Sequence, residues 1–272
     1  MRKLLIATGG LFVMIVTLPL FSAFEAHIIN VSATIENALS VNTTAIRFGT
    51  VFPQEHLKKP LSVQLSNSFL AEGRVDDVSY FIRQKPRCAI TWDEGKSMDE
   101  ASATTGHVMA GDNPATPAVR ENYWVDCGAA PRELDPTKGE VWGVLPSLCE
   151  YLSKEADHEV GRSPNDETMP SFHVPFKIFH GDNPATTDVV ETDWVYWKDT
   201  QGELSKTHPI DPVDNWLIDL AVPCFGGHCA QDWADFVHRL NPQADPNLFI
   251  QPLANEHKIF GCDLWVEVSA VN

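Results

Sequence analysis

Hydrophobic and polar residues alternate along several short stretches of this chain. Successive side chains of a β-strand point to opposite faces of the sheet, so this alternation predicts strands that bury one face. The cleanest stretch is 61–66, in which Leu61, Val63 and Leu65 alternate with polar residues. The same pattern predicts strands over residues 29–35, 46–52, 61–66, 78–84, 216–222 and 262–269. Short strands separated by turn-forming Pro, Gly and Asn are typical of an antiparallel β-sandwich.

Helical periodicity is confined to two stretches. Residues 145–154 carry apolar side chains at helical spacing, and residues 229–240 place Trp233, Phe236 and Val237 on one face. We expect both stretches to be short surface helices packed on a sheet. The chain is therefore predicted to be mainly β.

One short sequence occurs twice. Gly-Asp-Asn-Pro-Ala-Thr stands at 111–116 and again at 181–186, and strand-like residues flank both copies. Asn and Asp hydrogen-bond their own backbone and Pro fixes φ, so each copy predicts the turn of a β-hairpin. The predicted hairpin strands are 107–109 with 123–125, and 176–179 with 194–197.

This repeat has two interpretations. The copies are either duplicated turn chemistry or exposed loops that bind a ligand such as calcium or a glycan. Calcium would use the carboxylate and amide oxygens, and a glycan would stack on the tryptophan rings. The candidate binding residues are Asp112, Asn113, Asp182, Asn183, Trp124 and Trp194. Apart from calcium, we predict no cofactor.

The amino terminus has the pattern of a secretory signal. Arg2 and Lys3 precede an apolar run that ends at Phe24, and small residues near its end offer cleavage points. Positive charge before a short apolar segment directs export. We therefore predict that residues 1–26 are a signal peptide. The remaining protein is predicted to be secreted, extracellular or at the cell surface, with no stable membrane span after signal removal.

Composition narrows the range of partners. The chain has 272 residues, of which 43% are hydrophobic, including 8 Trp and 14 Phe, so a sizeable core can be buried. Lys and Arg total 20 against 37 Asp and Glu, which gives a net charge of -17. Phosphate backbones repel so acidic a chain, and we expect no nucleic-acid partner.

An even number of cysteines in an exported chain favours disulfides over free thiols. Zinc is the alternative for Cys224, His228 and Cys229, although no second ligand pair lies nearby in the sequence. Sequence alone does not determine the connectivity. The pairing suggested by the predicted elements is Cys88 with Cys127, Cys149 with Cys262, and Cys224 with Cys229.

The sequence contains no recognised catalytic motif. It has no Gly-x-Ser-x-Gly elbow, no phosphate-binding loop and no dinucleotide fingerprint. The string at 158–162 begins like a zinc-peptidase motif but ends in Arg162, which does not bind metals. We therefore assign neither catalytic residues nor metal ligands, and an enzyme is the less favoured class.

Several features of residues 1–85 follow one another in a definite order. They are an apolar signal ending at Ala23-Phe24, a first strand over 29–35, Ile46 and Phe48 followed by Val51 and Pro53, and the strand Leu61 to Leu65. In this order they resemble the TasA/camelysin family of secreted matrix-fibre proteins with a dedicated-signal-peptidase-type signal. The resemblance implies a jelly-roll-like sandwich that assembles into matrix or surface fibres. Residues 27–272 would be a single domain, with insertions at about 86–215.

After removal of the signal, the strand over 29–35 would lie close to a free amino terminus. Such a strand either pairs within its own sheet or inserts beside the open edge of a neighbour, where main-chain bonds give affinity. Repeated head-to-tail insertion makes a filament. We expect self-association into fibres through the assembly strand, whose apolar residues are Ile29, Val31, Ala33 and Ile35.

Two other functions stay open at this point. One is a secreted metal-dependent peptidase of the camelysin kind, built from ligands scattered along the chain. The other is a surface adhesin or glycan-binding module that uses the hairpin loops and tryptophan rings.

Overall fold

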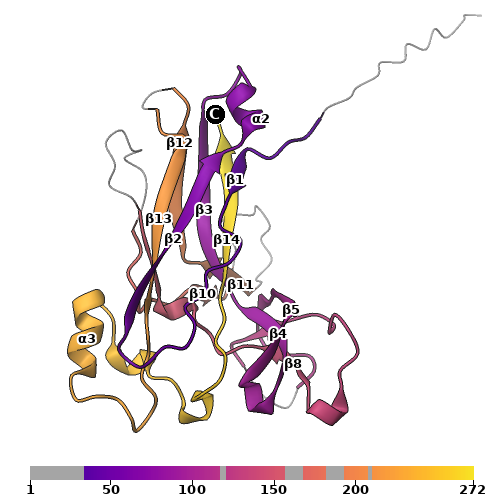
Figure 1. Cartoon of the computed structure of the whole chain (residues 1–272), viewed down its shortest axis with the longest axis vertical. Helices are drawn as coiled ribbons and strands as arrows, with labels where there is room; N and C mark the ends of the chain where they lie inside the picture. The colour runs from indigo at the N-terminus through magenta and orange to yellow at the C-terminus, as the bar shows by residue number, and fades with distance from the viewer. Residues whose placement is uncertain (1–33, 117–120, 157–167, 182–192, 208–209) are drawn as a thin grey trace, which may run out of the picture. The chain divides into compact units, whose positions relative to one another are not determined.

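The structure is a computed structural model of the chain. It describes residues 34–116, 121–156, 168–181, 193–207 and 210–272. In these residues every pair of named strands is antiparallel, and the chain is mainly β (Figure 1). The predicted fold class is therefore confirmed, while the jelly-roll strand order and the signal peptide stay predictions. No helix of the described part has the length and apolar character to cross a bilayer.

Two sheets form the main body of the fold. The strand order is β1-β2-β13-β9 in one sheet and β12-β3-β14 in the other. The first sheet consists of β1 (Leu39–Val41), β2 (His56–Leu65), β13 (Val213–Ala221) and β9 (Leu152–Glu155). The second sheet consists of β12 (Asp199–Ser205), β3 (Asp77–Lys85) and β14 (Asp263–Val271). Both sheets join strands from the beginning and the end of the chain.

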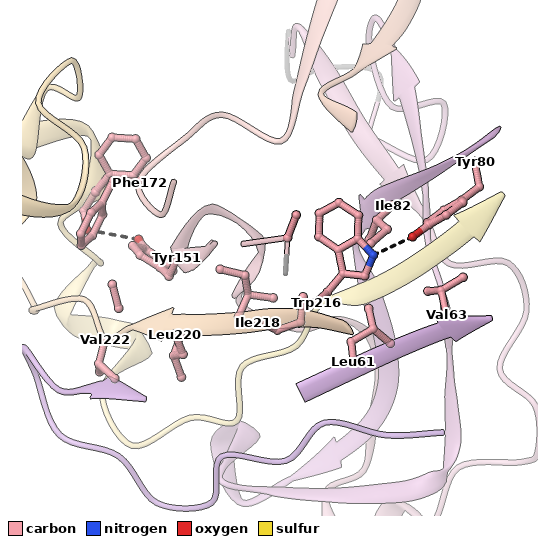
Figure 2. Packing of buried hydrophobic residues seen from close by; sticks show 14 of the residues in the cluster. Leu61, Val63, Tyr80, Ile82, Tyr151, Phe172, Trp216, Ile218, Leu220 and Val222 are labelled. Carbon is pink, nitrogen blue, oxygen red and sulfur yellow. Dashed lines mark hydrogen bonds between the residues drawn. The ribbon is translucent and has the colours of Figure 1, made fainter. Parts of the chain in front are cut away.

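The inward faces of the two sheets share one hydrophobic core. Leu61 and Val63 of β2 are buried together with Trp216, Ile218 and Leu220 of β13 (Figure 2). These are the positions that the period-two pattern placed inward. Burying them removes apolar surface from water, which stabilises the sandwich.

Tyr80 of β3 joins the two sheets across this core. Trp216 Nε1 donates a hydrogen bond of 2.7 Å to the Tyr80 hydroxyl, and the two rings meet edge to face at 6.4 Å. The Tyr80 hydroxyl also bonds Asp214. Gly202 lies directly opposite Tyr80 on β12, and a Cβ at that position would lie 2.4 Å from the tyrosine ring. Only glycine therefore leaves room for this ring.

The other described residues add three smaller sheets. One has the order β5-β4-β8, and the others are two-stranded hairpins. Their strands are β4 (Arg87–Trp92), β5 (Ser97–Thr105), β8 (Val141–Val144), β6 (His107–Ala110), β7 (Tyr123–Asp126), β10 (Phe176–Phe179) and β11 (Trp194–Trp197). The predicted insertion range, 86–215, also contains β9 and β12, which are strands of the sandwich itself. Only parts of that range are therefore additions to it.

Helices are short in the described residues. The α-helices are α2 (Asn67–Ala71) and α3 (Trp233–Leu240), and the 3₁₀ turns are η2 (Asp93–Gly95), η3 (Pro136–Lys138), η4 (Cys149–Tyr151), η5 (Pro246–Phe249) and η6 (Leu253–Asn255). The helix predicted within 229–240 is present as α3, with Trp233, Phe236 and Val237 buried. The prediction of a helix over 145–154 is wrong. That stretch forms η4 and then β9, because its last residues pair with β13, and tertiary pairing overrides a weak local preference.

Candidate functional site

A large groove lies beside the edge of the sandwich. It has a volume of about 990 Å³. Its lining includes residue 41, residues 43–53 and residues 256–266, the last of which include the start of β14. Leu61, Ile218 and Leu220 of the first sheet also line it. The groove therefore reaches the hydrophobic core from outside.

β14 presents an open edge. Among the described strands it is the last of its sheet and has β3 as its single partner. An edge strand carries unpaired N–H and C=O groups that can accept another strand. Trp265 and Val268 of this strand are 38% and 45% exposed, and a register shift lies between Val268 and Ala270. The edge is thus apolar and incompletely covered.

Another segment that lines the groove was predicted to be a strand over 46–52. This prediction is wrong, because the described structure has no strand there. No main-chain hydrogen bond joins residues 43–51 to any other described segment. Ile46, Phe48 and Val51 nevertheless pack partly buried against the core. The residues alternate as a strand requires, but none of the described strands pairs with them.

Ion pairs hold the rim of this groove. Arg47 forms a 2.8 Å ion pair with Glu100 of β5, with both side chains more than half exposed. At the start of β14, Asp263 accepts hydrogen bonds from Arg87 at 3.0 Å and from the Thr105 hydroxyl at 2.7 Å. Exposed pairs contribute little stability, because water screens them. They link Arg47 to β5, and the start of β14 to β4 and β5.

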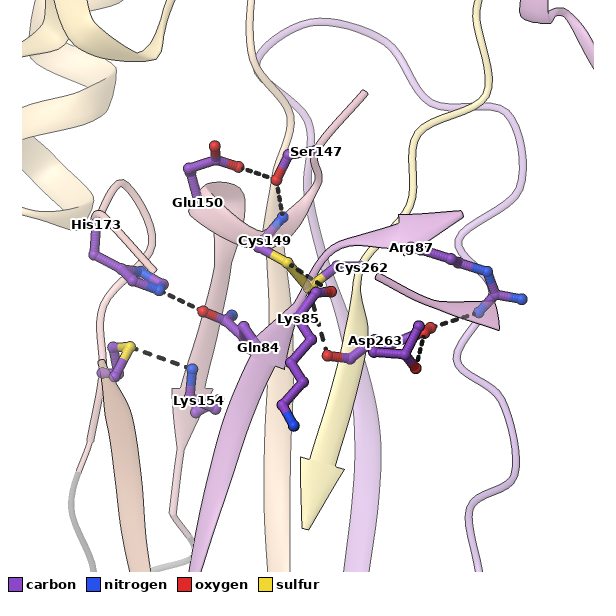
Figure 3. Close-up of a disulfide and its surroundings, with 12 residues drawn as sticks. Gln84, Lys85, Arg87, Ser147, Cys149, Glu150, Lys154, His173, Cys262 and Asp263 are labelled. Carbon is purple, nitrogen blue, oxygen red and sulfur yellow. Dashed lines mark hydrogen bonds and ion pairs between the residues drawn. A yellow bond between two sulfur atoms is a disulfide. The ribbon is translucent and has the colours of Figure 1, made fainter. Parts of the chain in front are cut away.

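All six cysteines form disulfides, in the pairing that the sequence suggested. The bonds are Cys88–Cys127, Cys149–Cys262 and Cys224–Cys229. Cys149–Cys262 ties η4 to the residue before β14, with 5.1 Å between the Cα atoms (Figure 3). It thereby anchors the start of the open edge strand.

The zinc interpretation of Cys224, His228 and Cys229 does not fit the structure. The two sulfurs are bonded to each other, and a disulfide sulfur is not a thiolate ligand. His228 Nδ1 instead lies 3.9 Å from Glu256 Oε1. Within the described ranges no cluster of three or more His, Cys, Asp or Glu side chains is suited to hold a metal ion.

Both predicted hairpins are present. β6 pairs with β7, and β10 pairs with β11. The two hairpins contact each other, and the rings of Tyr123 and Phe176 meet edge to face at 5.0 Å. The strands that flank the two copies of the repeat are therefore neighbours in space.

The loop of the first copy is held by its own acidic and amide groups. Asp112 accepts a 2.7 Å hydrogen bond from the Glu121 N–H, and Asn113 accepts one of 2.9 Å from the Ala115 N–H. This is the turn chemistry that the sequence predicted. Asp182 and Asn183 of the second copy lie outside the described residues, as do Ile29, Val31 and Ala33 of the predicted assembly strand. Ile35 belongs to none of the described strands.

A small polar cavity lies between the two hairpins. Its volume is about 300 Å³. The lining residues are Gly111, Asp112, Glu121, Asn122, His180 and Asp193. His180 Nδ1 is 2.6 Å from Asp193 Oδ1. The cavity thus joins residues of both repeat copies, which the sequence alone did not place together.

Sequence reasoning missed a group of buried polar residues near the disulfide. Lys154 of β9 is fully buried, and its Nζ lies 3.2 Å from the Met169 sulfur (Figure 3). Burial lowers the pKa of Lys154 to about 7. Burial and the nearby Lys154 lower the pKa of His173 to about 3, and its Nε2 lies 2.6 Å from Gln84 Oε1. No sequence signal marks this group, because Lys154 falls where a surface helix was predicted.

Comparison with known protein families, curated proteins and solved structures finds no match to this chain. The resemblance to the TasA/camelysin family therefore stays a prediction that depends on the order of features in residues 1–85.

Proposed function

We propose that this protein is a secreted structural subunit of an extracellular matrix or cell-surface fibre. Residues 29–35 of one copy insert into the groove of the next copy and pair with β14. The observation that carries the proposal is the groove itself, which reaches the core and is bordered by an open edge strand. In the described structure, residues 43–51 and β14, which both line the groove, do not pair with each other.

The length and pattern of the assembly strand suit this groove. A strand rises about 3.3 Å per residue, so residues 29–35 span roughly 23 Å, and β14 is 9 residues long. Insertion would direct the apolar side chains of residues 29, 31, 33 and 35 to one face, which is the face that meets Leu61, Ile218 and Leu220. The polar residues between them would face water.

Charge also favours insertion of this segment. Residues 27–35 contain no Asp, Glu, Lys or Arg, although the whole chain has a net charge of -17. An uncharged segment enters an apolar groove without the desolvation cost of a buried charge. The contact uses two different surfaces of the subunit, so it need not close and can continue as a filament.

The covalent structure is compatible with an extracellular role. All six cysteines are oxidised in pairs. Disulfides persist outside the reducing cytosol and stabilise proteins that work there. They favour a secreted building component over a cytosolic one.

The test uses processed protein that begins at residue 27, with Val31→Asp as the disruptive variant. A charge on the inserted face would have to be buried, so we expect Val31→Asp to stay monomeric in analytical ultracentrifugation and to form no filaments in electron microscopy. Thr34→Asp is the matched control, because residue 34 lies on the opposite face of the strand. It is expected to assemble like the wild type.

Two results would overturn the proposal. One is a wild-type protein that stays monomeric at high concentration. The other is assembly that Val31→Asp and Thr34→Asp weaken equally, which would show that the alternation of this strand does not set the contact.

A further inference from the structure

The second hairpin exposes aromatic residues on one face. The register pairs Phe179 with Trp194 and Lys177 with Tyr196, so these four side chains project from the same face of the two strands. We call this set the aromatic face. Phe179 is 42% exposed and Tyr196 is 51% exposed. Rings of this size are normally buried, so their exposure requires an explanation.

The rings of the aromatic face support one another. Phe179 and Trp194 stack at 4.9 Å with 17° between their planes. Tyr196 meets Phe179 edge to face at 6.2 Å and Trp194 at 6.3 Å. Such contacts hold the rings in place at low conformational cost. The aromatic face is therefore a preformed surface of ordered rings.

The opposite face of the hairpin already supplies its packing. Phe176 contacts Trp197 at 5.4 Å and Tyr123 of the first hairpin at 5.0 Å. One buried face is enough to hold a hairpin against a neighbour. The second set of rings, on the exposed side, is not needed for that contact.

Hydrogen-bonding groups lie at one end of the aromatic face. His180 follows Phe179 and Asp193 precedes Trp194, and both line the polar cavity between the hairpins. Asp112 and Glu121 contribute two more carboxylates there. Carboxylate oxygens accept hydrogen bonds from hydroxyl groups, whereas the aromatic rings bind the apolar faces of flat molecules.

We propose that the aromatic face and this cavity bind a neutral polysaccharide. The C–H faces of its sugar rings stack on Phe179 and Tyr196, while hydroxyl groups of a neighbouring sugar reach the acceptors of the cavity. A sugar chain combines both chemistries along its length. The carboxylates lining the cavity disfavour an anionic polymer, because like charges repel. A fibre subunit with this surface would attach to matrix or cell-wall sugars.

The first hairpin provides an internal comparison. Met109 lies opposite Trp124 as Phe179 lies opposite Trp194, and Met109 is 43% exposed. Asp126 of the first copy stands at the position of Tyr196 in the second. The first hairpin therefore lacks two of the rings that form the aromatic face.

The experiment measures binding of the secreted protein to cellohexaose and chitohexaose by isothermal titration calorimetry. Polygalacturonate is the anionic comparison. We expect binding to at least one neutral oligosaccharide, at least tenfold weaker in Phe179→Ala and in Tyr196→Ala. Met109→Ala, the same position in the first copy, is expected to bind like the wild type. Tyr196→Phe keeps the ring and is expected to retain binding.

Several results would overturn this inference. They are no binding to either neutral oligosaccharide, binding to polygalacturonate alone, or equal losses in Phe179→Ala and Met109→Ala. Near-ultraviolet circular dichroism of each variant checks that the fold is intact. If Phe179→Ala does not fold, the contrast between Tyr196→Ala and Tyr196→Phe decides the matter. The outcome is independent of filament formation, because no residue of the aromatic face lines the groove beside β14.

Discussion

The sandwich and the second hairpin use aromatic residues in opposite ways. In the sandwich, Tyr80 and Trp216 are enclosed, hydrogen-bonded to each other and surrounded by aliphatic side chains. In the hairpin, Phe179 and Tyr196 hold each other in place but remain open to water. The contrast lies in ring burial rather than ring content: the buried rings belong to the core, whereas the exposed rings are those that we propose bind a ligand.

The largest expected effects concern the sandwich core and the longest disulfide loop. Trp216→Ala removes a fully buried ring and the hydrogen bond that its Nε1 donates to the Tyr80 hydroxyl, so we expect the free energy of unfolding to fall by about 3–5 kcal/mol. Urea denaturation monitored by circular dichroism measures this free energy. A loss below about 1 kcal/mol would show that the two sheets do not share this core.

Loss of the longest disulfide loop is expected to cost about as much as Trp216→Ala, and the two extremes of loop length test the origin of disulfide stabilisation. Cys149 and Cys262 are 113 positions apart, whereas Cys224 and Cys229 are 5 apart. Replacing each pair by Ala is expected to cost about 4–5 kcal/mol for the long loop and about 2 kcal/mol for the short one, if loop entropy dominates. Thermal unfolding of the two double variants gives the comparison. Equal losses would contradict the entropic account.

Lys154 is expected to act in the opposite direction. Its pKa falls from 10.5 to about 7 in the folded protein, so protonated Lys154 is penalised by burial. The penalty is complete below pH 7 and is relieved as pH rises from about 7 to 10.5. Lys154→Met should therefore stabilise the protein by about 2–4 kcal/mol at pH 6, and by progressively less toward pH 10.

The control for this prediction is Lys177→Met, which replaces an exposed lysine of the second hairpin. It is expected to leave the free energy of unfolding unchanged at both pH values. A destabilising Lys154→Met would mean that the ammonium group has a compensating partner in the folded protein.

The smallest expected effect is in the aromatic face. Tyr196→Ala removes a half-exposed ring, so we expect the free energy of unfolding to fall by less than about 1 kcal/mol, with a correspondingly small drop in melting temperature. Differential scanning calorimetry measures it. A loss comparable to that of Trp216→Ala would make Tyr196 a structural residue and remove the distinction between the two regions.

Sequence pattern predicted the regions where local preference and tertiary contact agree. β2 alternates cleanly over 61–65 because one of its faces lies on the core, and both hairpins follow from their repeated turn residues. The predictions of a strand over 46–52 and of a helix over 145–154 were wrong for a common reason. Their patterns are sound, but whether a strand forms depends on a partner that lies far away in the sequence.

The functional surfaces were predicted less completely. Trp194 was identified, whereas Phe179 and Tyr196 were not, because exposure cannot be deduced from an alternating strand with aromatic residues on both faces. The groove beside β14 could not be predicted, because its position depends on which strand lies at the edge of the sheet. The local hydrophobic pattern does not determine strand order. Lys154 was missed because a lysine is normally exposed.

Hydrogen exchange on β14 tests the central claim most directly. The acceptor is the Val31→Asp protein, and the added ligand is a peptide of residues 27–36. We predict that the peptide slows exchange at alternate amides of β14, which face away from β3, and leaves β12, the other edge of the same sheet, unchanged. Unaltered exchange on β14, or equal protection of β14 and β12, would contradict insertion beside β14.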